Sequence, residues 1–221
     1  MPTPLNLADA ETAVDAQTFA SRAARVGDGA VRLRASSGIL VMTCAPIAPR
    51  GILDSAPTIL GVRVLAADPE LVCDLVVDGA SLRAHGATLE LPDAGVRAAW
   101  AGISPPVSGW TVSAEIASTD LAGAARRGME EVATTVPTDA GEDVVRQIRA
   151  AVWGAPDGAL GGIPRGVGFV AQVLGFLGQD AEAVPIRESG AWLRLSLRRG
   201  HVLVRRPAVN ARNMGAGPAS G

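Results

Sequence analysis

The chain has 221 residues, a formal net charge of −2 and 48% hydrophobic residues, of which few are aromatic. A protein with this near-neutral charge has no overall electrostatic attraction for a nucleic acid or an anionic membrane. All 20 basic residues are arginines and tyrosine is absent, which excludes Schiff-base chemistry on a lysine, a standard P-loop and catalysis by tyrosine.

The composition also bears on source and compartment. An arginine-rich, lysine-free sequence is typical of a bacterium with a high-G+C genome. Residues 1–25 lack a basic region followed by an apolar run, so we expect no secretory signal and a cytoplasmic protein. Cys44 and Cys73 are then expected to be reduced, buried core residues. With only His85 and His201 beside them, they do not make a standard zinc site, and we expect neither a metal nor a cofactor.

The N-terminal half predicts one helix followed by a run of strands. Residues 10–26 predict a helix with a thin apolar stripe, which indicates a position on the surface. Asp78-Gly79 is a strong hairpin turn signal among the strands that follow. These short strands, separated by turn residues, predict a mostly antiparallel sheet. Their expected ranges are 30–34, 39–45, 58–66, 71–77, 81–84 and 88–91, with residues 96–103 open between strand and helix.

The clearest interruption is Ser-Pro-Pro-Val-Ser-Gly at residues 104–109, which is either a long loop or an internal domain boundary. A strand at residues 110–116 follows, then a helix at residues 119–132. A second helix is expected to open with Asp139 as its N-cap and Glu142 three residues later, in a capping-box pattern.

The segment from Ile163 to Leu177 predicts an almost wholly apolar helix. Pro164 suits its first turn and Gly178 the position just past its end. Two apolar stripes and a third, small face leave no face suited to solvent, so the helix is expected to be buried. Its length of about 21 Å falls short of the roughly 30 Å hydrocarbon core of a membrane.

A strand at residues 183–187 and an arginine-rich hairpin, with strands at 191–197 and 201–206, complete the expected fold. We therefore predict an α+β protein with a mostly antiparallel sheet in its N-terminal half, and three helices and a β-hairpin in its C-terminal half. Residues 1–206 are expected to form one domain, with a candidate internal boundary near residues 104–109. Residues 207–221 are expected to form a disordered tail.

Two motifs offer functional alternatives. Gly166, Gly168 and Ala171 make a GxGxxA pattern, typical of dinucleotide binding, but no buried strand is expected before it, which favours glycines that serve helix packing. Three helices followed by a basic hairpin have the order of a winged helix. The third helix, however, has no polar face to offer a DNA groove.

The arginine-rich hairpin is the remaining candidate site. Residues 186–212 contain seven arginines and only one acidic residue, Glu188. If this segment binds an anion, Arg194, Arg199 and His201 are the residues expected to hold it. The catalytic residues, if any, are not indicated by any motif.

The leading hypothesis is a non-catalytic interaction or assembly protein, acting as a homo-oligomer or with a protein partner and not at a membrane. A DNA-binding protein that uses the hairpin is the first alternative, and an enzyme acting on a small anionic substrate is the second.

Overall fold

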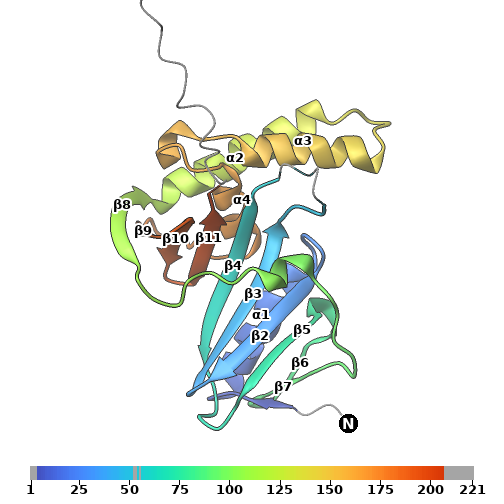
Figure 1. The fold of residues 1–221 in the computed structure, drawn as a ribbon, viewed down its shortest axis with the longest axis vertical. Coiled ribbons are helices and arrows are strands. Elements are labelled where there is room, and N and C mark those ends of the chain that lie inside the picture. The colour runs from blue at the N-terminus through green and yellow to red at the C-terminus, as the bar shows by residue number, and fades with distance from the viewer. Residues whose placement is uncertain (1–3, 52–53, 55, 207–221) are drawn as a thin grey trace, which may run out of the picture.

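A computed structural model describes residues 4–51, 54 and 56–206 of the chain. The predicted tail, 207–221, lies outside the described residues. The fold is α+β, as expected. Strands from both the N-terminal and the C-terminal half of the chain form one large antiparallel sheet (Figure 1). Its strands, in spatial order, are β5 (Cys73–Asp78), β2 (Ala30–Ser36), β3 (Ile39–Ile47), β4 (Thr58–Ala66), β11 (Gly200–Arg205), β10 (Trp192–Leu197), β9 (Ala183–Ser189) and β8 (Thr111–Ala117).

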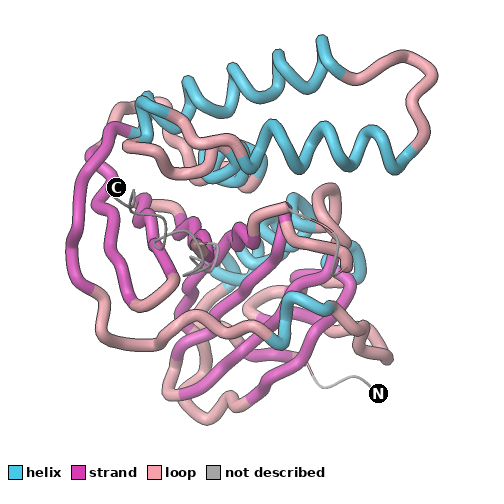
Figure 2. Tube along the Cα trace, turned by 45° about the horizontal axis from the view of Figure 1, so that its top comes forward, coloured by secondary structure: helices cyan, strands magenta, loops and turns pink. Residues whose placement is uncertain are grey.

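Smaller elements complete the fold. A three-stranded sheet holds β1 (Leu5–Asn6), β7 (Thr88–Glu90) and β6 (Arg83–His85). The helices are α1 (Ala10–Ala23), α2 (Ser118–Thr135), α3 (Glu142–Gly154) and α4 (Gly166–Val173). Figure 2 shows α2 and α3 running side by side at one end of the molecule, away from α1. Residues 96–103, for which the sequence predicted either a strand or a helix, contain a short 3-10 turn, Ala99–Gly102.

Helix α1 packs one face on the N-terminal half of the sheet and keeps its other face exposed, so it lies at the surface, as expected. Asp9 caps it by accepting a hydrogen bond from the Thr12 amide at 2.7 Å. The buried face is mainly alanine with Phe19, whereas the larger apolar residue Val14 is exposed. Small side chains let the helix backbone come close to the sheet, so the buried face is wider than its large residues indicate.

The two halves of the chain join edge to edge in the large sheet. Strand β4, from the N-terminal half, pairs antiparallel with β11, from Thr58 opposite Arg205 to Val62 opposite His201. The hairpin of β10 and β11 therefore lies inside the sheet, with β9 on its other side. This position contradicts the winged-helix alternative, because a wing is a hairpin with free edges.

Helix α4 is shorter than the expected helix, Ile163–Leu177. It ends at Val173 because Gly175 takes the left-handed conformation, with φ +70°. The Phe176 amide then donates to the Ala171 carbonyl at 2.9 Å, which is the six-to-one bond of a Schellman motif. Gly175, not Gly178, thus terminates the helix. Among the described residues, no helix is long and apolar enough to cross a membrane.

The glycines of the GxGxxA pattern are contact points in the core. A Cβ at Gly168 would lie 2.4 Å from the Leu121 carbonyl oxygen of α2, and one at Gly166 would lie 2.7 Å from Ile59 Cδ1 of β4. Residues Gly158–Leu160, before α4, form a 3-10 turn and not a strand. The pattern therefore serves close packing of α4 against α2 and the sheet, as the packing interpretation predicted.

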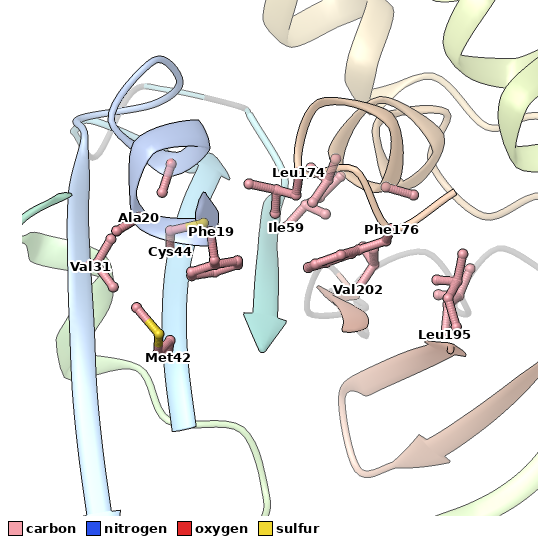
Figure 3. Close-up of a cluster of buried hydrophobic side chains, with 14 of the residues drawn as sticks. Phe19, Ala20, Val31, Met42, Cys44, Ile59, Leu174, Phe176, Leu195 and Val202 are labelled. Carbon is pink, nitrogen blue, oxygen red and sulfur yellow. The ribbon is translucent and has the colours of Figure 1, made fainter. Parts of the chain in front are cut away.

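The helix-side core is continuous between the two halves (Figure 3). The rings of Phe19, from α1, and Phe176, after α4, are stacked with their centroids 6.2 Å apart. Leu174 is almost fully buried and fills the space left by the missing side chain of Gly61 on β4. Residues from both halves thus share one core.

A segment between β7 and β8 covers part of the other sheet face. Trp100 is buried against a second cluster that includes Ala45, Leu60 and Leu203. Arg32, on β2, donates to the Ala101 carbonyl at 2.7 Å and holds this segment on the sheet. The covering segment ends at Trp110, directly before β8.

Helix α3 departs from the expected capping box. Its N-cap is Gly141, which has no side chain to accept a hydrogen bond, and Asp139 lies outside the helix. Arg146 pairs with Asp143 on the exposed face.

Candidate functional site

The hairpin presents its two kinds of residues to opposite sheet faces. Leu193, Leu195 and Leu197 are buried on the helix side. Arg194 and Ser196 alternate with them on the other face, as expected for a pleated strand.

Strand pairing assembles a group of polar side chains on that second face. Arg187 of β9 lies opposite Arg194, and His201 of β11 lies opposite Ser196. Arg187 Nη1 reaches Ser196 Oγ at 3.4 Å. We call these four residues the arginine cluster. Directly opposite residues in antiparallel strands have Cβ atoms about 5 Å apart, so the cationic groups are close neighbours.

The tryptophan that precedes β8 borders the arginine cluster. The Arg194 guanidinium carbon lies 4.6 Å from the centroid of the Trp110 ring. The Trp110 indole N–H donates to the Pro106 carbonyl at 3.0 Å, which fixes the ring. A cation–π contact of this kind orients the guanidinium without neutralising its charge.

The arginine cluster has no acidic partner among the described residues. No carboxylate of the described residues lies within ion-pair distance of Arg187, Arg194 or His201. The residues that the structure does not describe, 1–3, 52–53, 55 and 207–221, include no aspartate or glutamate. Arg194 Nε and His201 Nδ1 are buried without a hydrogen-bond partner in the described part of the chain. Buried polar atoms are normally satisfied, so each such atom needs an explanation.

Electrostatics in the arginine cluster disfavour positive charge. Burial, and then the charges of Arg194, Arg187 and Arg63, lower the pKa of His201 below its usual value. Burial and the charge of Arg187 likewise lower the pKa of Arg194. Both shifts follow from cations that lie close together and partly out of water.

The structure brings together two of the three predicted anion-binding residues. Arg194 and His201 share the arginine cluster, whereas Arg199 lies at the hairpin turn, where its carbonyl accepts a hydrogen bond from Arg63 on the helix side. Arg187 takes the place expected for Arg199. The sequence shows Arg187 and Arg194 in different strands but does not show their register, and the register brings the two together.

A second candidate site is the free edge of the large sheet. Strand β8 has seven residues and is an end strand, and the five residues Thr111–Glu115 are all exposed. An uncovered edge of this length is a template for pairing with another strand.

The pairing of β8 with β9 indicates which backbone groups face outward. Glu115 lies opposite Pro185, which has no N–H to donate. This pair therefore cannot exchange both hydrogen bonds, so the N–H and C=O of Glu115 point away from β9. The Ser118 amide donates to the Glu182 carbonyl at 2.9 Å. Because inward and outward backbone groups alternate along a strand, Glu115, three residues earlier, faces away from β9.

The opposite edge of the sheet differs. The Val96 amide donates to the Val76 carbonyl of β5 at 2.9 Å, so the chain itself covers part of that edge. Strand β8 is thus the more open end of the sheet.

The remaining candidate groups are separate from these sites. No group of three or more His, Cys, Asp or Glu residues that could hold a metal occurs among the described residues. Cys44 and Cys73 are both free, and Cys44 is buried whereas Cys73 is only partly so. Burial raises the pKa of both thiols. His85 is exposed, 3.9 Å from Glu90.

Two family models match the chain, one for each half. Residues 1–102 match a family described as Domain of unknown function (DUF8010). Residues 105–209 match a second family, described as Domain of unknown function (DUF8185). No curated protein is significantly similar to the chain.

Among solved structures, similar chains include bacterial DNA polymerase III β subunits. The Caulobacter crescentus protein is 14% identical, with a TM-score of 0.49, over 92% of this chain and 65% of that one. A sliding clamp from Bartonella birtlesii is 13% identical, with a TM-score of 0.48, over 92% and 65%. A putative β subunit from Eubacterium rectale is 8% identical, with a TM-score of 0.49, over 92% and 64%. The chain thus spans 65% or less of the length of these three proteins, and similarities this weak carry no information on partners or activity.

Proposed function

We propose that this protein is a non-catalytic assembly protein that associates with a second copy of itself through strand β8. The observation that carries this proposal is the open edge of β8, with the backbone groups of Glu115 directed outward. Association would extend the sheet from one copy into the next by main-chain hydrogen bonds.

The two ends of the sheet favour pairing of β8 with the same strand of the second copy. A head-to-tail contact would need β5 as the acceptor, and the Val96 amide already occupies the Val76 carbonyl on that edge. An antiparallel β8–β8 contact has two-fold symmetry and closes as a dimer. If it is centred on Ala114, Glu115 of each copy lies opposite Ser113 of the other, and the carboxylates avoid each other.

A proline at Glu115 tests this proposal. Pro185 already precludes a double hydrogen bond at this pair, so Glu115→Pro removes an outward N–H and leaves the β8–β9 ladder intact. Glu115→Ala is the matched control, because it removes the carboxylate but keeps the N–H. Light scattering after size exclusion should give a dimer for the wild type and for Glu115→Ala, and a monomer for Glu115→Pro. Circular dichroism checks that all three proteins are folded.

Two results would contradict the proposal. One is a wild-type protein that stays monomeric at the highest concentration reached. The other is a folded Glu115→Pro variant that dimerises as the wild type does.

A further inference from the structure

The arginine cluster contains more positive charge than its surroundings compensate. Arg187 and Arg194 lie side by side on adjacent strands, and His201 joins them without any carboxylate at ion-pair distance among the described residues. Glu115, on the neighbouring strand, lies opposite Pro185 and takes part in none of the ion pairs found among the described residues. Glu188 pairs with Arg206. Such a group is destabilised by its own repulsion unless an anion joins it.

The donors that remain free suit a small anion. Trp110 lies against the Arg194 guanidinium, and Arg194 Nε is buried, so its terminal nitrogens are the groups left for a ligand. Of the two His201 ring nitrogens, only Nδ1 is buried without a partner. A neutral ring with its proton on Nε2 avoids a buried, unsatisfied N–H and keeps a donor toward solvent.

From this geometry we infer that the arginine cluster is a binding site for a small phosphate group, either inorganic phosphate or a phosphate monoester. Arg187 and Arg194 supply guanidinium donors, and His201 Nε2 and the Ser196 hydroxyl supply two more. These four donor groups exceed the two oxygens of a carboxylate and suit the three or four oxygens of a phosphate group. The net charge of −2 gives no long-range attraction for a polyanion such as duplex DNA.

The chain offers a direct probe because it contains only two histidines, His85 and His201. Titration of the full-length protein with inorganic phosphate, at constant ionic strength set by chloride, is followed by the NMR signals of both imidazole rings. The His201 signals should shift and saturate, and those of His85 should not. The pKa of His201 should rise when phosphate is bound, because an anion favours its charged form.

Variants separate this site from general screening. Arg194→Gln and Arg187→Gln should each weaken phosphate binding by about tenfold or more, as expected for loss of a charged hydrogen bond. Each should also raise the pKa of His201 without phosphate, which a purely structural role would not do. Arg199→Gln, in the same hairpin but outside the arginine cluster, is the matched control. If Arg194→Gln does not fold, Arg187→Gln and Ser196→Ala still test the site without removing the Trp110 contact.

Three outcomes would overturn this inference. Phosphate could shift both histidines without saturation, or Arg199→Gln could weaken binding as much as Arg187→Gln. Alternatively, duplex DNA could displace phosphate and bind more tightly, with the same dependence on Arg187 and Arg194, and the ligand would then be a nucleic acid. None of these outcomes bears on the β8 dimer, because Glu115→Pro leaves every residue of the arginine cluster in place.

Discussion

Asp157 holds together the loop between α3 and α4. Its side chain is 5% exposed and accepts hydrogen bonds from Arg127 Nη2 at 2.8 and 2.9 Å. It also accepts from the Ala159 amide at 3.0 Å. Burial opposes ionisation, but the Arg127 hydrogen bond, the Ala159 amide and the charges of Arg127 and Arg165 prevail, and the pKa of Asp157 is lowered. The carboxylate is therefore stabilised in its charged form by the groups around it.

Removing this carboxylate should destabilise the protein. Asp157→Ala is expected to reduce the free energy of unfolding by about 2–3 kcal/mol, below the roughly 3–5 kcal/mol for a fully buried pair because Arg127 remains partly hydrated. Asp143→Ala, which breaks the exposed pair with Arg146, is the control and should cost less than about 1 kcal/mol. Urea unfolding curves measure both. Equal losses in the two variants would contradict the structural role of Asp157.

His201 should make stability depend on pH. An unfolded histidine titrates near 6.5, and burial with Arg194, Arg187 and Arg63 lowers the pKa of His201 in the folded protein. As pH falls through 6.5, the unfolded state takes up a proton that the folded state resists, so stability falls from pH 7.5 toward the folded pKa. His201→Asn should remove this part of the decline, and His85→Asn, at an exposed ring, should retain it. Urea unfolding at pH 7.5 and 5.5, in buffers without phosphate, measures the effect. A wild-type decline no larger than that of His201→Asn would contradict it.

At the scale of single elements, Gly168 of helix α4 is subject to two opposing effects: glycine lowers the stability of the helix, but its missing side chain allows α4 to pack closely on α2. Glycine in a helix interior costs about 1 kcal/mol relative to alanine, yet a Cβ at Gly168 would lie 2.4 Å from the Leu121 carbonyl oxygen. Backbone atoms at that distance cannot yield without moving α2 away from α4.

Gly168→Ala is therefore expected to destabilise the protein by about 1–3 kcal/mol, as overpacking does. Gly123→Ala, in α2, is the control, since its Cβ would meet a side-chain atom, Arg127 Nη1 at 3.1 Å, and no backbone atom. That change should be neutral or stabilising by up to about 1 kcal/mol. Thermal unfolding followed by circular dichroism compares the two variants. A more stable Gly168→Ala protein would show that α2 and α4 are not in close contact.

Local sequence patterns predicted which helices and strands form better than they predicted where each helix ends and which strands pair. The strand at residues 191–197 was predicted from the sequence and is found as β10, because strand periodicity is local. The end of α4 was placed at Gly178 and not at Gly175, because either glycine can take the left-handed conformation and only the Phe176–Ala171 hydrogen bond distinguishes them. The capping role of Asp139 was wrong for the same reason: several residues near a helix start compete to cap it.

The candidate site depended on contacts that no local pattern encodes. Arg187 joins Arg194 through the register of β9 and β10, and β4 meets β11 across about 140 residues of sequence. The outward groups of β8 follow from its pairing with Pro185. The prediction of Arg194 and His201 rested on their shared hairpin, while Arg187 required knowledge of the strand beside it.

At the scale of the whole molecule, the two halves share a sheet and a core although separate family models match them. Strands β4 and β11 form five opposed residue pairs across the junction, and Phe19 stacks on Phe176. A shared core of this kind makes independent unfolding of one half costly, because it would expose the apolar face of the other. We therefore predict that residues 1–206 unfold as one cooperative unit, as a single domain would.

Native-state hydrogen exchange can test this cooperativity. Leu195, in β10, is fully buried and belongs to the C-terminal half, so Leu195→Ala should lower the free energy of unfolding by about 2–5 kcal/mol. If the molecule opens as one unit, the slowest amides of β2 and β3, in the N-terminal half, should exchange faster by the same factor as those of β9 and β10. If the halves open separately, β2 and β3 should keep their wild-type rates while β9 and β10 accelerate. Mass spectrometry of peptides from both halves of one sample distinguishes these outcomes, because each half serves as the internal reference for the other.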